Sequence, residues 1–268
     1  MSLNLKDINI LESQAELANL PKGKLLINTI NAHSYNTSQK DALLAKALTA
    51  GVLIPDGASV VKACRWLGAK SQPRERCAGW DLFAFEMQSL EEEAIESATR
   101  IVRTGDGDED GLYITCDPNA KPKTVMFMGS SEKVLSLIRE KAAVEYPHLN
   151  VVTYSPPFKS EFSDEDNRAI IDAINAAQPD LLWIGMTASK QEKWTYSHWD
   201  ELHINCHVGT IGAVFDFFAG TSQRAPLWWQ RHGLEWLYRL IKEPRRMWRR
   251  YVIGNPLFLW NVLKERLS

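Results

Sequence analysis

Short apolar runs and amphipathic stretches alternate along the first 220 residues of the chain. The apolar runs are rich in branched side chains, which predicts buried strands; they lie at residues 25–30, 52–56, 124–129, 150–155 and 180–186. Between them, residues 131–146 and 163–178 place apolar side chains along one face of a helix, and Ser163 followed by acids is a favourable helix start. Short buried strands separated by helices are typical of a largely parallel α/β sheet with right-handed crossovers.

The remainder of the chain has a different pattern, because its apolar positions are interrupted by prolines. Pro226, Pro244 and Pro256 divide it into about three predicted helices, over residues 226–242, 244–253 and 256–266. No repeat or low-complexity linker interrupts the earlier part. We therefore predict one α/β domain over residues 1–220 and a helical appendage over residues 221–268.

Composition places the chain among ordinary folded proteins. Of 268 residues, 45% are hydrophobic and 24% are charged, which excludes a disordered or collagen-like chain. The four cysteines are far apart and form no CxxC pair, so we expect free thiols in a reducing compartment. The N-terminus resembles neither a signal nor a transit peptide, and no stretch reaches the roughly 18 apolar residues that span a bilayer. We expect a protein that is cytosolic or lies on a membrane without crossing it.

The net charge of −2 conceals an uneven distribution. Residues 220–268 hold ten Lys and Arg against three acids, a local charge of +7, and five of the ten tryptophans. Basic side chains together with indoles favour binding to an anionic surface, either a membrane or a nucleic acid. A membrane fits better, because the rest of the chain carries a net charge of −9 and would repel a DNA duplex. The alternative is a helical cap that packs its tryptophans on the body and leaves its arginines in solvent.

Candidate chemistry lies directly after the predicted strands, where ligands bind in open α/β sheets. These loops carry hydroxyl and amide side chains and one isolated carboxylate, Asp56. Such a set favours recognition of a sugar or a nucleotide. The glycines match neither the dinucleotide fingerprint nor a Walker loop.

Several motifs follow one another in a fixed order along the chain. They are NTIN (28–31), PDGASVVKACRWLG (55–68), RCAGWDL (76–82), PDLLWIGMTASKQEKW (179–194), GAVFDFFAG (212–220) and the C-terminal string RAPLWWQRHGLEWLYRLIKEPRRMWRRYVIGNPLFL (224–259). In sequence and in order they resemble the signature segments of the WecG/TagA/CpsF glycosyltransferases, glycosyltransferase family 26. The resemblance runs from about residue 20 to the end of the chain.

The resemblance implies a Rossmann-like α/β body and an inverting, metal-independent transferase without a cofactor. Members of this family move a sugar, often of the N-acetylmannosamine type, from a UDP-sugar to a sugar linked to polyprenyl diphosphate. The appendage is expected to approach the membrane and to complete the site. This implies a peripheral protein on the inner face of the cell membrane; homo-oligomerisation is left open.

The resemblance also assigns roles to individual residues. Inversion by direct displacement needs a carboxylate to take the acceptor's proton, and Asp56 matches the family's base. Arg76 suits a diphosphate oxygen or the leaving group. Thr29, Asn31 and Gln191 would bind a sugar, although capping of loop backbone is an alternative for the two amides. Three arginines of the appendage match family arginines that would balance the charge on UDP, namely Arg239, Arg246 and Arg249. For Arg245 and Arg250 a position at the rim without a role is an alternative.

Other features are less specific. Ser59 and the Gly129-Ser130-Ser131 loop replace family glycines, which indicates a subfamily with a different donor or acceptor. The acidic segment 106–117 has EF-hand-like spacing, but a solvated acidic hairpin fits it better than a metal site. His203, Cys206 and His207 lack a fourth zinc ligand nearby, so we expect a structural loop. The rival to an enzyme is a degenerate family member that binds a nucleotide sugar or a membrane without catalysis.

Overall fold

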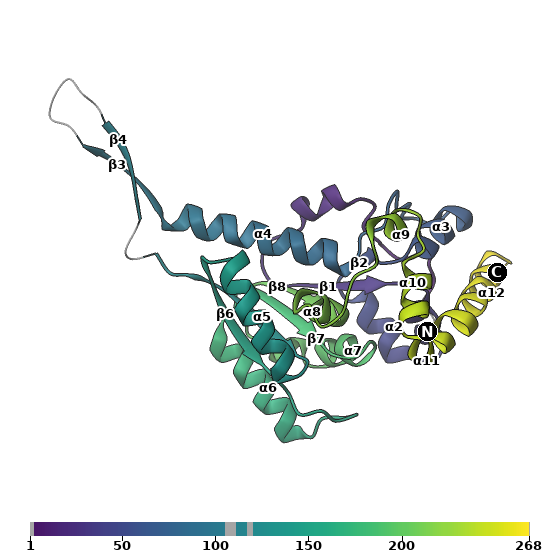
Figure 1. Ribbon diagram of the computed structural model, residues 1–268. Coiled ribbons are helices and arrows are strands. Elements are labelled where there is room, and N and C mark those ends of the chain that lie inside the picture. Colours follow the sequence, from purple (N-terminus) through teal and green to yellow (C-terminus); the bar gives the residue numbers. More distant parts are fainter. Residues whose placement is uncertain (1–2, 105–110, 117–119, 268) are drawn as a thin grey trace.

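A computed structural model of the chain describes residues 3–104, 111–116 and 120–267. Six strands form one sheet in which every pair is parallel, in the order β2-β1-β8-β7-β5-β6 (Figure 1). Their bounds are β1 Leu25–Ile30, β2 Val52–Pro55, β5 Lys123–Gly129, β6 Leu149–Tyr154, β7 Leu181–Gly185 and β8 His207–Thr210. The predicted parallel α/β fold is confirmed.

Five of these strands coincide with the predicted apolar runs, whereas β8 was not predicted. This strand has only four residues and contains a glycine, so its apolar pattern is too short to recognise. Gly209 is required there because Trp183 of β7 lies against it: a Cβ would be 2.2 Å from the indole ring. Although short, β8 lies between β1 and β7 and joins the two halves of the sheet.

Helices cover both faces of the sheet. On one face, α4 (Gly79–Ala98), α5 (Glu132–Glu145) and α8 (Gly212–Phe218) enclose an aromatic core in which the ring centroids of Phe83 and Phe218 are 4.9 Å apart. The other face is covered by α6 (Asp164–Ala177) and α7 (Lys190–Ser197). Next to β1 and β2 lie α1 (Ala32–Ser38), α2 (Ala42–Thr49) and α3 (Ala58–Leu67).

The two predicted helices of the body are confirmed as α5 and α6. Ser163 caps α6 as expected, since its hydroxyl accepts a hydrogen bond of 3.3 Å from the Asp166 amide. The isoleucines of α6 then lie buried against the sheet.

An antiparallel hairpin extends from the end of α4, away from the body and on the side opposite the appendage (Figure 1). It consists of β3 (Thr99–Thr104) and β4 (Gly111–Cys116). A hairpin agrees with the expectation for the acidic segment. All acids of that segment lie outside the described residues, so its solvation and any metal binding stay predictions.

The C-terminal helices differ from prediction at two places. The first predicted helix is broken into α9 (Leu227–Arg231) and α10 (Glu235–Lys242), because Gly233 turns the chain at a φ of +69°. The break expected at Pro256 is wrong: α11 (Pro244–Trp248), a π-helical turn (Arg249–Ile253) and α12 (Gly254–Leu267) run on without interruption. Pro256 lies in the first turn of α12, directly after the π turn, whose different backbone pairing adapts the helix to a residue without an N–H.

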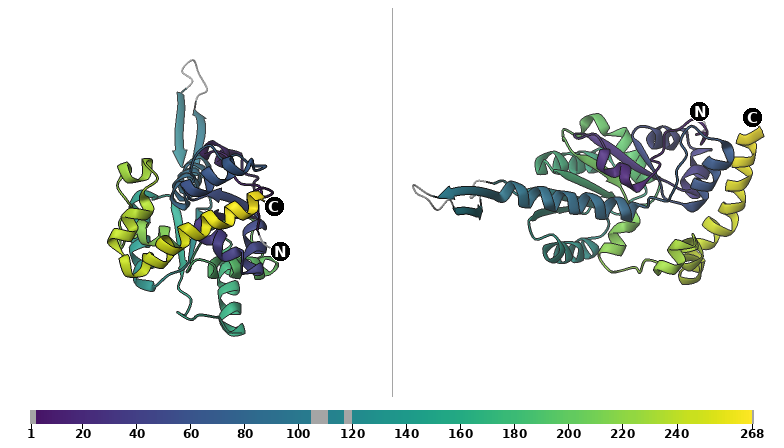
Figure 2. Two further views of the ribbon diagram at one scale, coloured as in Figure 1. Left: turned by 90° about the vertical axis from the view of Figure 1, so that its right-hand side faces the viewer. Right: turned by 90° about the horizontal axis from the view of Figure 1, so that it is seen from above.

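The last helix packs on the body beside α1 (Figure 2). Phe258 is buried and meets Tyr35 edge-on, with ring centroids 5.3 Å apart. Buried Glu265 accepts hydrogen bonds from the Tyr35 hydroxyl at 2.6 Å and from the Lys6 amide at 2.7 Å. These contacts hold the end of the appendage against the α/β core. No helix in the described part of the chain combines the length and hydropathy needed to cross a bilayer.

Candidate functional site

Asp56 lies at the carboxyl end of β2, at the edge where ligands bind in parallel sheets. Its amide donates to the Ile30 carbonyl of β1 at 2.9 Å, which fixes the backbone, and Gly57 then starts α3. The Asp56 side chain is half-buried and accepts no hydrogen bond from any residue that the structure describes. A carboxylate held in this way is available to a substrate proton.

Burial raises the pKa of Asp56 to about 6, above its ordinary value near 3.8. Arg76 is the strongest opposing influence and lowers this pKa, while Glu235 raises it and Arg239 and Arg250 lower it. The carboxyl group is therefore ionised at neutral pH and more basic than an exposed aspartate. A base whose pKa lies close to the working pH is well suited to general catalysis.

Two arginines and a glutamate gather beside Asp56; we call them the arginine–glutamate cluster (Arg76, Glu235 and Arg239). Arg76 Nη1, from the loop before α4, donates to Glu235 Oε2 at the start of α10. Arg239 Nη2, one turn along α10, donates to Glu235 Oε1 at 3.1 Å. All three side chains are largely buried, at 13–27% exposure. The cluster joins the appendage to the body across the candidate site.

A second ion pair joins the appendage to the body near Asp56. Arg224 Nη2 lies 3.4 Å from Asp81 Oδ1 at the start of α4, and the Arg224 guanidinium lies 5.8 Å from the centre of the Trp80 ring. Gly233 passes close to α3, where a Cβ would be 3.2 Å from that of Ala58. The helices α9 and α10 therefore cover the loop that carries Asp56.

The other two predicted appendage arginines do not reach Asp56. The Arg246 side chain is 73% exposed and its Nε pairs with Glu243 at 3.0 Å. Arg249 is also exposed, with its guanidinium 5.4 Å from the Trp248 ring centre. Arg250, for which a rim position without a role was an alternative, is half-buried and lies close enough to Asp56 to lower its pKa. Binding of UDP by Arg246 and Arg249 stays a prediction.

The predicted sugar-binding residues lie at the same edge of the sheet. Thr29 is half-buried near the end of β1. Asn31 caps α1, since its Oδ1 accepts from the amides of His33 at 3.0 Å and Ser34 at 3.1 Å. Gln191 is buried, and its Oε1 accepts from the amides of Met186 at 3.2 Å and Gly212 at 3.1 Å. The capping alternative therefore describes both amides in this structure, and their binding of a sugar stays a prediction.

The positions that depart from the family pattern shape the surrounding loops. Ser130 has a φ of +57°, a left-handed conformation that a glycine adopts more easily. Ser189, in the loop before α7, has a φ of +72° and donates its amide to Glu192 Oε2 at 2.7 Å. Ser59 is exposed in the first turn of α3. Strained loops of this kind are common at functional sites.

Within the described residues, no group of three or more His, Cys, Asp or Glu side chains is arranged to hold a metal ion. The suspected zinc trio is dispersed: His207 pairs with Glu86 at 2.9 Å and with the Pro21 carbonyl, Cys206 is buried, and His203 is exposed. These three residues form a structural segment around β8, as expected.

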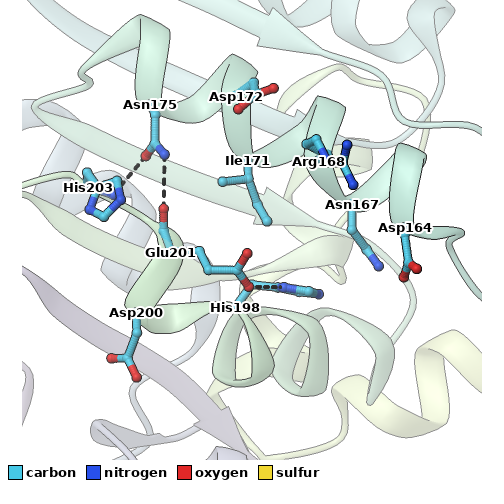
Figure 3. A pocket seen from close by; sticks show the side chains of 10 residues that line it. All are labelled: Asp164, Asn167, Arg168, Ile171, Asp172, Asn175, His198, Asp200, Glu201 and His203. Carbon is cyan, nitrogen blue, oxygen red and sulfur yellow. Dashed lines mark hydrogen bonds and ion pairs between the residues drawn. The ribbon is translucent and has the colours of Figure 1, made fainter.

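A separate groove of about 630 Å³ lies between α6 and the turn Trp199–Glu201 (Figure 3). Several of its polar groups bond to one another: Asn175 Nδ2 donates to the Glu201 carbonyl at 2.9 Å, and His198 Nδ1 lies 2.7 Å from Glu201 Oε1. None of the residues around Asp56 lines it. The groove is therefore not part of the candidate site.

Comparison with known proteins identifies a family and several relatives. The sequence model of the glycosyl transferase WecG/TagA/CpsF family matches residues 3–102 and 113–268. The unmatched internal stretch begins in β3 and ends in β4. A protein of Bacillus spizizenii named N-acetylglucosaminyldiphosphoundecaprenol N-acetyl-beta-D-mannosaminyltransferase is 28% identical over 92% of this chain and 82% of its own length. Proteins of the same name from Bacillus subtilis and Staphylococcus aureus are 27% and 23% identical, over 90% and 93% of this chain and 79% and 84% of their own lengths.

Proposed function

The chain belongs to the glycosyl transferase WecG/TagA/CpsF family, and on this premise we propose that it is an inverting, UDP-sugar-dependent glycosyltransferase. Its donor sugar is N-acetylmannosamine or a related hexose, and its acceptor is a sugar linked to polyprenyl diphosphate, in the synthesis of a cell-surface polysaccharide. The names of the relatives, mannosaminyltransferases that act on an N-acetylglucosaminyl-diphosphate lipid, support both assignments.

The observation that carries the proposal is the position of Asp56 opposite the arginine–glutamate cluster. In the proposed reaction the Asp56 carboxylate takes the proton of the acceptor hydroxyl as its oxygen attacks the anomeric carbon. The bond from that carbon to the UDP oxygen breaks at the same time, and the electron pair leaves with UDP. Arg76 and Arg239 lie close enough to Asp56 to influence its pKa, and they are suited to balance this developing charge without a divalent metal.

We further propose that residues 1–220 form the catalytic domain and that residues 221–268 attach it to the inner face of the cell membrane. Most of the exposed large apolar side chains of the described residues belong to this appendage, among them Ile241, Ile253 and Leu259. Exposed Arg245, Arg246 and Arg249 lie among them. Apolar side chains with basic neighbours favour binding in the headgroup region of an anionic membrane, where the lipid acceptor resides.

A transfer assay tests the proposal. The full chain is incubated with a panel of UDP-sugars and a short-chain polyprenyl-diphosphate N-acetylglucosamine, and both UDP and the lengthened lipid are measured. We expect one donor to give equal amounts of the two products and Asp56→Asn to give almost none. A chain that binds UDP-sugars yet releases no UDP with any donor would support the non-catalytic alternative instead.

A further inference from the structure

Arg250 is a half-buried cation that has no hydrogen-bond or ion-pair partner among the described residues. Its Nε is buried and lacks an acceptor, and its guanidinium carbon lies 5.8 Å from the centre of the Tyr251 ring. Other arginines of the appendage are paired: Arg224 with Asp81, and Arg239 with Glu235. Buried polar groups are nearly always hydrogen-bonded, so this exception requires a cause.

The surroundings of Arg250 lie at the carboxyl edge of the sheet, next to the candidate base. Three titratable side chains near it belong to three different elements: His33 in the first turn of α1, Asp56 directly after β2, and Glu192 at the start of α7. The packing of α1 on this part of the appendage places His33 and Arg250 together, because Asn36 Nδ2, one turn after His33, donates to the Gly254 carbonyl, one turn after Arg250, at 2.7 Å. Burial, with Arg250 as the second influence, lowers the pKa of His33 to about 4, so that His33 is neutral near pH 7. Glu192 accepts hydrogen bonds from the Ser189 amide at 2.7 Å and from Gln191 Nε2 at 3.0 Å.

We infer that Arg250 and His33 form a subsite for a diphosphate beside Asp56, an inference that rests on the proposed function. The guanidinium supplies several N–H donors in a planar fork that matches phosphate oxygens, and the neutral imidazole supplies one more. Both side chains lack partners among the described residues, so a bound anion would take up their donors without breaking an existing bond.

Arg250 lies in a π-helical turn, Arg249–Ile253, whose backbone pairing differs from that of an α-helix. Consecutive residues of a helix point in different directions, so Arg249 is exposed while Arg250 is half-buried. π-Helical turns often occur at functional sites, which agrees with a binding role.

Two diphosphates are chemically suited to this subsite: that of the nucleotide and that of the lipid acceptor. Calorimetric titration of the full chain with UDP and, separately, with farnesyl diphosphate distinguishes them. We expect Arg250→Gln to weaken binding of at least one of these compounds roughly tenfold or more, as for a lost hydrogen bond between charged groups. The compound that loses affinity identifies the diphosphate that is bound.

Arg231→Gln is the matched control, because Arg231 is an exposed arginine of the same appendage. Arg250→Lys, which keeps the charge, is expected to recover part of the affinity. If Arg250→Gln binds both compounds within twofold of Arg231→Gln, the inference is overturned. If Arg250→Gln is weakened but His33→Gln binds normally, His33 is removed from the subsite.

Thermal melting separates binding from a structural role. Since Arg250 forms no bond in the free protein, Arg250→Gln should melt within about 1 °C of the wild type but lose the stabilisation that UDP or farnesyl diphosphate provides. Melting several degrees lower without either compound would overturn the inference in favour of a structural role. Sugar transfer by Arg250→Gln at the wild-type rate and affinity would refute the subsite alone, whereas a wild type that neither binds nor transfers would refute the proposed function too.

Discussion

Arg76 donates a hydrogen bond to Glu235, a residue 159 positions later in the chain, and so connects the loop before α4 to the first turn of α10. Glu235 also accepts a hydrogen bond from Arg239, and it thereby holds two cations near Asp56. Although burial tends to raise its pKa, Arg239 and Arg76 lower the pKa of Glu235 below the ordinary value, so it is ionised at neutral pH. One carboxylate thus determines where the appendage meets the body.

Replacement of Glu235 by Gln should therefore impair catalysis although Glu235 is not proposed to touch the reacting atoms. The loss of its charge leaves Arg76 and Arg239 unbalanced and frees α10 from the body. We expect a tenfold or larger fall in kcat/KM and faster proteolysis between residues 221 and 253. Glu243→Gln is the control, since Glu243 pairs with the exposed Arg246. Equal activity and equal proteolysis in the two variants would contradict a positioning role for Glu235.

Asp56→Asn should lower the transfer rate by roughly 10²- to 10⁴-fold, the usual contribution of a general base. The same variant should melt at a higher temperature than the wild type at pH 8. The pKa of Asp56 is raised in the fold to about 6, so ionisation destabilises the folded state, and this cost develops between about pH 4 and 6. Amide substitution removes the cost, and the gain in melting temperature should disappear below pH 4. Near-normal transfer by Asp56→Asn would exclude it as the base.

The rate of transfer should depend on the protonation of Asp56. We expect kcat/KM to fall as the pH decreases through about 6, because only the ionised carboxylate can take a proton. Arg76 lowers the pKa of Asp56, so Arg76→Gln should shift this limb to higher pH as well as reduce the rate. A profile measured with saturating acceptor from pH 4.5 to 9 provides the test. A limb near pH 4 in the wild type would show that the base is an exposed carboxylate.

The last helix should contribute to the stability of the α/β core. Phe258 is buried against Tyr35, so Phe258→Ala is expected to cost about 3–5 kcal/mol in the free energy of unfolding. Leu259→Ala, at a neighbouring position that is 66% exposed, should change it by less than about 0.5 kcal/mol. Urea unfolding of both variants measures the difference. Equal stabilities would mean that α12 does not pack on the core in solution.

Deletion of residues 221–268 should abolish transfer and vesicle binding together. The remaining α/β core is expected to stay folded but to melt at a lower temperature, because Tyr35 and the Lys6 amide lose Glu265 as an acceptor. Circular dichroism and a UDP-release assay report the two effects. A truncated chain with full activity would remove the appendage from the mechanism.

The exposed apolar side chains of the appendage should determine membrane affinity. The double variant Ile241→Ser/Ile253→Ser is expected to lose most of its binding to vesicles that contain anionic lipid, since both side chains are more than half exposed beside basic residues. Val144→Ser, at a still more exposed position on α5, should bind as the wild type does. Sedimentation with vesicles at low and high salt separates the contribution of the apolar side chains from that of the basic ones. Similar losses in the two variants would contradict a specific membrane surface.

Much of the fold could be predicted because buried strands and amphipathic helices carry local patterns. The strands β1, β2, β5, β6 and β7 are runs of branched apolar residues, and Ser163 marks the start of α6. Strand β8 could not be predicted in this way, because its place in the sheet depends on the close approach of Gly209 to Trp183. The effect of Pro256 was also misjudged, since the π-helical turn before it adapts the helix.

The candidate site, like the fold, could be predicted in part. Asp56, Arg76 and Arg239 could be predicted as site residues, because each lies in a segment that resembles the family. The partnership of Glu235 with Arg76, the burial of Arg250 and the outward direction of Arg246 could not be read from the order of residues. The chain by itself determined which chemical groups are present and on which strands and helices they lie, since these depend on neighbours along the chain. The tertiary structure decided which of those groups meet, because that depends on how α9 to α12 return across the sheet and pack on α1.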